Sequence, residues 1–367
     1  MKTNKIESFK IFLIIPIVLL FIFPIFAIGG PLVGIQYLTW FNYSQNPMGC
    51  EGEGWREHPF GLHEVRSLAF TPDERGFCYS SQDVETAKVH ARLFKDLGIN
   101  FVVFDESNFS KTVSPRNNPT FLAAKKAMLG FRSYTDYKIR VTFQLSLTCW
   151  GESCHNKVND RVERFTYNNY VKEHIEEIAQ LVVLNPDDFV KINGKPLLLF
   201  YISQGSNVYT LDNNLAFGGP GRIIPTIEEF NPNILVEGKK HFLSDFFSVR
   251  FAVVAADSFD YSTFSEKIWP FQCDSNTCLF KEVGYLSVAN HTTNSRSMDT
   301  FKNYFDSARG KDILLIRSWN EFSSTDENRQ KAYTLEPNTQ LHKYDRYSGP
   351  DPWFFFNAIK DTLRTLH

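Results

Sequence analysis

Residues 96–106 read DLGINFVVFDE, and this stretch indicates the fold more clearly than any other. Gly98 follows an amphipathic segment with helical spacing, so we expect it to end a helix. Residues 101–104 then form an unbroken apolar run, which is typical of a parallel strand that is covered on both faces. The run ends at Asp105 and Glu106, and because these residues are adjacent their side chains point to opposite faces of a strand. At most one of the two carboxylates therefore faces the interior of the fold.

The same alternation of strand-like and helix-like segments continues along the chain. Strands are expected at residues 33–38, 101–104, 140–147, 197–201, 249–255, 268–271, 283–288 and 313–316, with an Asn193-Gly194 turn before the fourth. Helices are expected at residues 81–97 with Ser81 as cap, 119–131 opened by Pro119, 167–184, 298–308 and 353–366. Strands that alternate with helices predict an α/β fold, and eight such units predict a (β/α)8 TIM barrel. A doubly wound open sheet is the structural alternative, although no glycine-rich phosphate turn follows the first strand.

Composition excludes two classes of protein. The 367 residues are 43% hydrophobic and 22% charged, which excludes a wholly disordered chain. Lys and Arg number 39 against 41 Asp and Glu, so no basic excess exists to neutralise the phosphates of a nucleic acid. The 35 Phe, 15 Tyr and 6 Trp suit either a large core or an aromatic-lined sugar cleft.

The first 30 residues have the pattern of a targeting segment. Lys2, Lys5 and Lys10 precede an apolar run at residues 11–28. The length of that run lies between a long signal peptide and a short membrane span, so both a cleaved signal peptide and an uncleaved anchor remain open. Either one predicts the secretory pathway, with the protein secreted or anchored in the Golgi or cell membrane. Residues 31–367 are then expected to form a single catalytic domain.

The cysteines agree with export. They fall in order as three close pairs, and nearest-neighbour pairing predicts the disulfides Cys50–Cys78, Cys149–Cys154 and Cys273–Cys278. Metal binding is the alternative, with His155 beside Cys154, but C-x4-C is not the usual zinc spacing. We therefore expect neither a metal nor a cofactor. Sequons for N-glycosylation occur at Asn42, Asn108 and Asn290.

Polar and aromatic residues gather where the expected strands end, and in a TIM barrel catalytic residues lie just beyond the C-terminal ends of strands. The catalytic candidates are Glu321 and Asp105, with Glu106 in reserve, and the candidates for substrate binding are Trp40, Asn108, Trp150, Tyr201, Trp319 and Asn320. Flat rings stack on sugar faces while amides and carboxylates bond hydroxyls, so these residue types predict a carbohydrate site. Core packing is the alternative for each of the tryptophans. The buried-face position of His90 favours a structural histidine, and no G-x-S-x-G or H-E-x-x-H motif occurs.

Several segments resemble glycoside hydrolase family 99 and its looser relatives. They are residues 96–105 with His90 upstream, residues 192–197 running into Phe200-Tyr201, residues 318–322, residues 335–338 and residues 347–353. Residues 318–322 read SWNEF and residues 335–338 read LEPN, which resemble the W-N-E-W and I-E-P segments of the family. The order and spacing of these segments agree with the family over most of the chain from residue 33 onward.

The resemblance implies a (β/α)8 fold and activity on mannose-type or related polysaccharide linkages. Members of the family are retaining endo-acting α-mannosidases or α-mannanases, and in their proposed mechanism the substrate's own 2-hydroxyl is the nucleophile. A glutamate at the place of Glu321 is the base there, and a second glutamate three residues on is the acid. This chain has Ser324 at the second place, which leaves Asp105, Glu106 or Glu336 to supply the acid. The Golgi endomannosidase of the family has an N-terminal membrane segment, which residues 11–28 would match.

The leading hypothesis is therefore a glycoside hydrolase that acts on a glycan or polysaccharide, with α-mannoside linkages as one option, by carboxylate acid/base catalysis. A catalytically inactive carbohydrate-binding barrel in the secretory pathway is the alternative, and Ser324 supports it. A glycan-processing protein of a polysaccharide-export cluster is a third option. The expected partner is a carbohydrate and not a nucleic acid, with membrane anchoring through residues 11–28 as a further expectation.

Overall fold

The computed structural model describes residues 30–39, 57–58, 62–63, 81–107, 113–146, 169–203, 233–254, 281–290, 295–320, 335 and 353–366. The apolar run at 11–28, the expected strand at 268–271, Trp40, Asn108, Trp150, Glu321, Ser324, Glu336 and the six cysteines lie outside these residues. Within the described ranges, no helix combines the length and the apolar character needed to cross a membrane.

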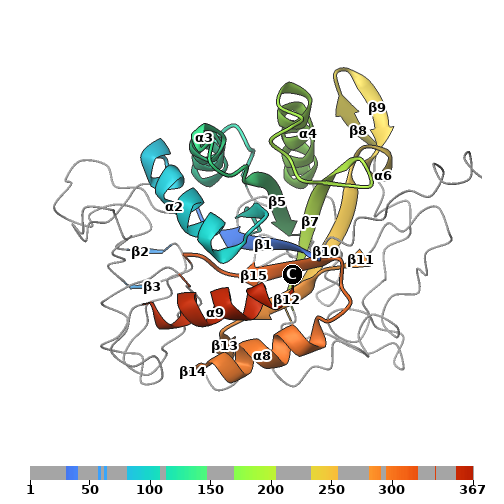
Figure 1. The fold of residues 1–367 in the computed structure, drawn as a ribbon. Coiled ribbons are helices and arrows are strands. Elements are labelled where there is room, and N and C mark those ends of the chain that lie inside the picture. Colours follow the sequence, from blue (N-terminus) through green and yellow to red (C-terminus); the bar gives the residue numbers. More distant parts are fainter. Residues whose placement is uncertain are drawn as a thin grey trace, which may run out of the picture.

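A curled parallel sheet forms the centre of the molecule (Figure 1). Its strands are β1 (Leu32–Tyr37), β4 (Phe101–Asp105), β5 (Arg140–Ser146), β7 (Lys195–Ser203), β10 (Ser248–Val254), β11 (Lys281–Glu282), β12 (Gly284–Ser287) and β15 (Ile313–Arg317). They lie in the order β11-β10-β7-β5-β4-β1-β15-β12, and each of these neighbours pairs in parallel. The short strand β6 (Lys191–Ile192) pairs antiparallel with β7.

The two ends of this strand order belong to one short segment of the chain. Strand β11 pairs with β10, and β12, which begins two residues after β11 ends, pairs with β15. Strand β12 also lies near β10. The sheet therefore curls back towards its own edge, as a TIM-like barrel requires.

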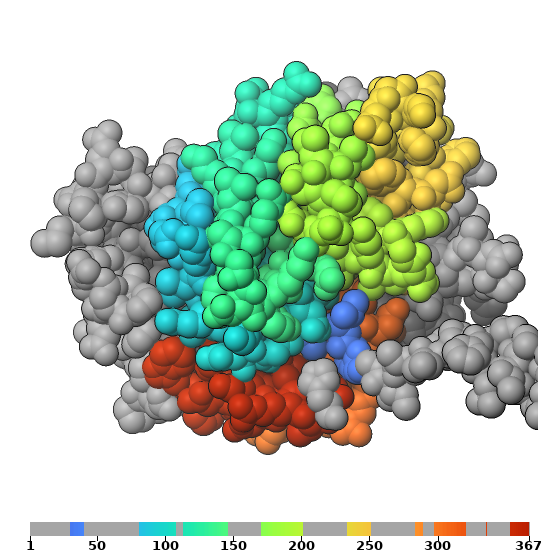
Figure 2. Space-filling view, turned by 45° about the horizontal axis from the view of Figure 1, so that its top comes forward, coloured from blue at the N-terminus to red at the C-terminus, as the bar shows by residue number. Residues whose placement is uncertain are grey.

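Helices cover the outside of the sheet. They are α2 (Val84–Leu97), α3 (Pro119–Ser133), α4 (Asn169–Leu184), α8 (Met298–Ser307) and α9 (Phe354–Arg364). In Figure 1 helices α2, α3 and α4 lie on one side of the sheet, and α8 and α9 lie on the other. Helix α9 packs against α2, and Figure 2 shows α9 beside α2, with α3 next to α2 and α4 beyond α3. The order of the helices thus follows the order of the strands that precede them.

Most of the expected elements are confirmed, with small shifts at their ends, but the cap of α2 is different. Asp83, not Ser81, is the N-cap, because its carboxylate accepts a hydrogen bond from the backbone N–H of Glu85. Gly98 ends α2 in the left-handed conformation with φ of 77°, as expected. The Asn193-Gly194 turn is also confirmed, with φ of 50° and 80°.

Four small features were not expected from the sequence. A hairpin of β8 (Asn233–Val236) and β9 (Lys239–Phe242) leads into α6 (Leu243–Phe246), and the pairs β2 (Glu57–His58) with β3 (Leu62–His63) and β13 (Ala289–Asn290) with β14 (Ser295–Arg296) are shorter still. The hairpin turns at Glu237 and Gly238, both with positive φ. Only two residues of β8 are buried, so its two-residue period is too short to recognise in the sequence.

The inner face of the sheet holds its own apolar cluster, which includes Phe101, Val103, Leu197, Leu199, Val283, Ile313 and Leu315. Gly34 on β1 faces this cluster directly opposite Phe101 on β4. A Cβ atom added to Gly34 would lie 2.4 Å from the Phe101 ring, which is far closer than atoms in contact can approach. The bare backbone of Gly34 therefore makes room for the aromatic ring inside the sheet.

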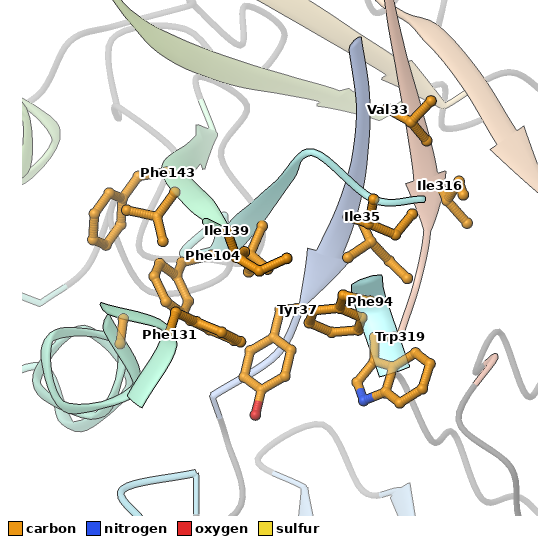
Figure 3. Packing of buried hydrophobic residues seen from close by; sticks show 14 of the residues in the cluster. Val33, Ile35, Tyr37, Phe94, Phe104, Phe131, Ile139, Phe143, Ile316 and Trp319 are labelled. Atoms are coloured by element: carbon orange, nitrogen blue, oxygen red, sulfur yellow. The ribbon is translucent and has the colours of Figure 1, made fainter. Parts of the chain in front are cut away.

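The outer face is lined by aromatic rings that pack against the helices (Figure 3). Tyr37 makes edge-on contacts with Phe94, Phe104 and Phe131, at centroid separations of 6.3, 6.0 and 5.7 Å. The chain of rings continues through Phe104 and Phe143, which lie 5.3 Å apart. These described aromatic residues thus form core rather than a sugar cleft.

The Gly34 contact predicts a large effect of a small substitution. Gly34→Ala should lower the free energy of unfolding by about 1–3 kcal/mol, because the new methyl group overlaps the Phe101 ring. Urea denaturation of Gly34→Ala, Phe101→Leu and the double variant measures the coupling between the two sites. The double variant should lose less stability than the sum of the single changes, and strictly additive losses would contradict the contact.

Candidate active site

Asp105 lies at the carboxyl end of β4 and is held by three donors. Its Oδ2 atom accepts a hydrogen bond of 2.6 Å from Gln36 Nε2, on the neighbouring strand β1. Its Oδ1 atom accepts from Gln144 Nε2 on β5 at 3.2 Å and from the backbone N–H of Ser107 at 2.9 Å. Hydrogen bonds that end on both oxygens favour the ionised carboxylate and fix its orientation.

This group faces the inner side of the sheet. Val103 and Phe101, two and four residues before Asp105, belong to the inner cluster, and alternation places Asp105 on the same face. Gln144 lies directly opposite Asp105 in the register of β4 and β5. The side chains of Gln36, Asp105 and Gln144 are almost fully buried, with Asp105 7% exposed. The inner face thus changes from apolar to polar at the carboxyl end of the strands.

Each glutamine also keeps one polar atom for another group. Gln36 Oε1 and Gln144 Oε1 are buried and accept no hydrogen bond from the residues that the structure describes. The bonds to Asp105 fix the amide orientations, because a carboxylate needs the NH₂ side of each amide. Two carbonyl oxygens therefore flank Asp105 as acceptors.

Glu106 points the other way, towards the helices. Its Oε2 atom lies 3.0 Å from Asn118 Nδ2 and 2.6 Å from Thr120 Oγ1, at the start of α3. Glu106 is completely buried, and its side chain follows the outward-facing Phe104 by two residues. The expectation that Asp105 and Glu106 face opposite sides is confirmed, and Glu106 does not join Asp105 in one cluster.

Burial dominates the chemistry of Glu106. It raises the pKa of the carboxyl from the usual 4.5 to about 8, against the opposing effect of its hydrogen-bond contacts with Thr120 and Asn118. The nearby charge of Asp105 adds to the rise of this pKa. Glu106 is therefore a neutral acid at neutral pH, but it lies behind the inner face of the sheet.

His174 on α4 also contacts Asn118. Its Nε2 atom lies 3.2 Å from Asn118 Nδ2, and its Nδ1 atom lies 2.8 Å from the carbonyl oxygen of Tyr170. Burial lowers the pKa of His174 below 6.5, so the imidazole is neutral at neutral pH. The contacts agree with one tautomer, in which Nδ1 carries the proton and Nε2 accepts from Asn118.

Asn320 joins the ends of the first and the last strand. Its Oδ1 accepts from the backbone N–H of Leu38 at 2.8 Å, and its Nδ2 donates to the carbonyl of Leu38 at 2.9 Å. The backbone N–H of Trp319 donates to the carbonyl of Gln36 at 2.7 Å. The amide of Asn320, predicted to bind substrate, is thus occupied in holding the chain just before Glu321.

Trp319 lies in the outer aromatic core. Its ring is 4.9 Å from Phe94 and 5.4 Å from His90, measured between centroids, and its side chain is fully buried (Figure 3). This position corresponds to the core alternative given above for the tryptophans. His90 lies with it, and its Nδ1 atom is 2.9 Å from the Tyr37 hydroxyl, as expected for a structural histidine.

Leu335 is held beside the same strand end. Its backbone N–H lies 3.0 Å from the carbonyl oxygens of both Ser318 and Trp319. Leu335, which directly precedes Glu336 in the sequence, therefore lies at the carboxyl end of β15, as does Asn320, which directly precedes Glu321. Of Tyr201, only the backbone is described, as part of β7.

Sequence reasoning missed Gln36 as a member of the site. Gln36 lies in a strand otherwise made of apolar residues and Gly34, and that polar position was the available signal. Among the described residues, no group of three or more His, Cys, Asp or Glu side chains is arranged to hold a metal ion.

Comparison with known proteins gives a fold but no family. No family model matches the chain, and no curated protein matches it by sequence. The structure of the GH99 endo-alpha-mannosidase from Bacteroides thetaiotaomicron is similar, with 13% identity, a TM-score of 0.50, and coverage of 91% of this chain and 97% of that one. A glycoside hydrolase-like protein has 12% identity and a TM-score of 0.47 over 92% of this chain and 95% of its own. The chain therefore has a fold like that of GH99, with low sequence identity.

The Asn320 contacts predict a loss of stability that a surface asparagine does not show. Asn320→Ala leaves the buried N–H and C=O of Leu38 without partners, and it should lower the free energy of unfolding by about 2–4 kcal/mol. Asn303→Ala on the exposed face of α8 is the matched control and should change it by less than about 0.5 kcal/mol. Equal effects in urea denaturation would show that Asn320 does not join the two strands.

Proposed function

We propose that this protein is a glycoside hydrolase that acts on a glycan or polysaccharide through carboxylate acid/base catalysis. The observation that carries the proposal is the fixed carboxylate of Asp105, held by two glutamines at the carboxyl end of a parallel sheet whose fold is like that of GH99. In barrel enzymes this end of the sheet holds the chemistry. The complete (β/α)8 barrel, with the expected strand at residues 268–271, is part of the proposal.

The proposed reaction assigns different work to two carboxylates. Asp105 has donors on both oxygens, so it suits the role of an ionised base or a charge that stabilises a developing cation. Glu321, the residue after Asn320, is then the proton donor to the leaving oxygen. In the later step the ionised Glu321 accepts a proton from the attacking water. Glu106 receives no part in the reaction, because its carboxyl group faces the helices and not the inner side of the sheet.

The same inner face offers groups that recognise hydroxyls. The carbonyl oxygens of Gln36 and Gln144 need donors, and sugar hydroxyls supply them. Because Asp105 fixes both amides, these acceptors need no reorganisation when a ligand binds. A neutral, hydroxyl-rich ligand fits this arrangement. We include α-mannosides among the first substrates to test, since the GH99 enzyme of similar fold is an endo-alpha-mannosidase.

Ser324 favours a second candidate function, a catalytically inactive carbohydrate-binding barrel. If the acid has been lost, the hydroxyl acceptors beside Asp105 would still bind a sugar. For either function we propose the secretory pathway as the location, with residues 11–28 as signal peptide or membrane anchor and with the cysteine pairs oxidised to disulfides.

Incubation of the full chain with α-mannan and a panel of other polysaccharides tests the first function. New reducing ends that appear with the wild type and not with Glu321→Gln support hydrolysis. Binding without new reducing ends, measured by affinity electrophoresis, supports the inactive barrel. If the chain neither binds nor hydrolyses any of the polysaccharides, both candidate functions are contradicted.

Substitutions at three positions test the assignment of the carboxylates. Glu321→Gln and Asp105→Asn keep the shape of each side chain but remove the ionisable group, so each should lower kcat by roughly 10²–10⁴. Ser324→Glu should not raise the activity, because the proposed carboxylate pair does not need it. The measurement is kcat on the best substrate of the panel, with Asn303→Ala as a control that should leave it unchanged. Activity created by Ser324→Glu in an otherwise silent chain would favour the inactive barrel.

A further inference from the structure

A single hydroxyl group lies between two acceptor oxygens on the outer side of the sheet. Thr120 Oγ1 is 2.6 Å from Glu106 Oε2 and 2.7 Å from Asn118 Oδ1. Both separations are typical of O–H···O hydrogen bonds, and each such bond needs its own proton. The threonine hydroxyl has only one proton to give.

The orientation of Asn118 cannot supply the missing proton. Its Oδ1 atom also accepts from the backbone N–H groups of Thr120 and Phe121, at 3.0 and 3.3 Å, as the N-cap of α3. Two fixed N–H donors identify this atom as the oxygen, so the NH₂ group must be on the other side. There Asn118 Nδ2 lies 3.0 Å from Glu106 Oε2 and 3.2 Å from His174 Nε2, and these two contacts use both protons of the NH₂ group.

We infer that Glu106 carries a structural proton on Oε2 and acts as a positioning residue for the end of β4. Glu106 donates to Thr120 Oγ1, Thr120 donates to Asn118 Oδ1, and Asn118 Nδ2 donates to Glu106 Oε2 and His174 Nε2. With this one proton, every short contact in the network has a donor and an acceptor. With an ionised Glu106, one of the two short contacts of Thr120 would join two oxygens with no proton between them.

The other oxygen of Glu106 agrees with this assignment. Glu106 Oε1 is buried and has no hydrogen-bond partner among the described residues. A buried carbonyl oxygen of a neutral acid without a hydrogen-bond donor costs far less free energy than a buried carboxylate oxygen without a donor. Among the residues that the structure describes, Asp105, His174 and Glu173 are the titratable groups that act on this network, and none of them pairs a positive charge with Glu106.

The network fixes the position of the candidate active site from behind. The backbone N–H of Glu106 donates to the carbonyl of Gln144 at 2.9 Å, so the segment after β4 stays beside β5. The Thr39 hydroxyl donates to the Thr120 carbonyl at 2.9 Å, which connects the end of β1 to the same helix start. Asp105 is the residue directly before Glu106, and its position depends on this anchoring.

The proton makes stability depend on pH with a definite sign. Where the folded chain holds a proton on Glu106 that the unfolded chain has lost, stability falls as pH rises, from about 4.5 up to about 8. His174 acts oppositely, because its lowered pKa removes stability as pH falls below 6.5. Between pH 6.5 and 8, Glu106 is therefore the member of this pair that titrates.

Comparison of the wild type with Glu106→Gln over that range tests the inference in the full chain. Gln is neutral at every pH, so the folding equilibrium constant of the variant relative to the wild type should rise about tenfold per pH unit from 6.5 to 8. Glu85→Gln, at an exposed site on α2, is the matched control, and its ratio should stay constant. A constant ratio for Glu106→Gln would overturn the inference.

Carbon NMR of protein labelled at the glutamate carboxyl carbons gives a second readout that needs no stable variant. One resonance should titrate with a midpoint near 8 and should have the shift of a protonated acid at pH 7. That resonance should be absent from Glu106→Gln and present in Glu85→Gln. Spectra in which every glutamate is ionised at pH 7 would show that Glu106 holds no proton. Both measurements are independent of whether the protein hydrolyses a glycoside.

Discussion

The contact between Asn320 and Leu38 is the constraint on which the site depends. These residues are 282 positions apart, and one side-chain amide satisfies both backbone groups of Leu38 where the first strand ends. The same joint brings the N–H of Trp319 to the carbonyl of Gln36 and the N–H of Leu335 to the carbonyl of Trp319. Because Gln36 also donates to Asp105, the carboxylate of β4 is positioned by the joining of strands that lie at opposite ends of the chain. The parallel sheet brings the strand ends to one side, and the contacts of Asn320 and Trp319 fix the end of β15 relative to the end of β1.

Two adjacent carboxyl groups acquire opposite chemistry from the faces they occupy. Asp105 faces inward and receives three hydrogen bonds, so charge is stabilised there. Glu106 faces outward into the packed layer under α3 and α4, where burial outweighs its hydrogen bonds and favours the neutral acid. The alternation of a strand is enough to separate an anion from a protonated acid over a single peptide bond. An acid with a raised pKa is therefore not, by that property alone, the acid of a reaction.

The sequence was sufficient for most strands of the parallel sheet and insufficient for the side chains that each strand end contacts. Strands β4 and β15 are continuous apolar runs because both of their faces are buried, and such runs can be recognised one at a time. Gln36 could not be assigned in that way, since its role depends on Asp105, 69 residues further along. Trp319 shows the same limit, because a tryptophan at a strand end suits a sugar face or a core equally well until the neighbouring rings are known. The N-cap of α2 is a smaller case. Ser81 and Asp83 are both suitable capping residues, and only the structure shows that Asp83 caps the helix.

These constraints bear on the source of the proton in the proposed reaction. In the proposed reaction one carboxyl group must be ionised and another must deliver a proton, and Asp105 is built for the first task. Adding a donor role to Asp105 would require it to release the hydrogen bonds that hold it, which would also free Gln36 and Gln144 from their orientation. The proposed reaction therefore takes its proton from Glu321, which directly follows Asn320 in the sequence. Ser324, at the place where the resemblance to family 99 puts a second glutamate, then need not be an acid for the proposed reaction to proceed.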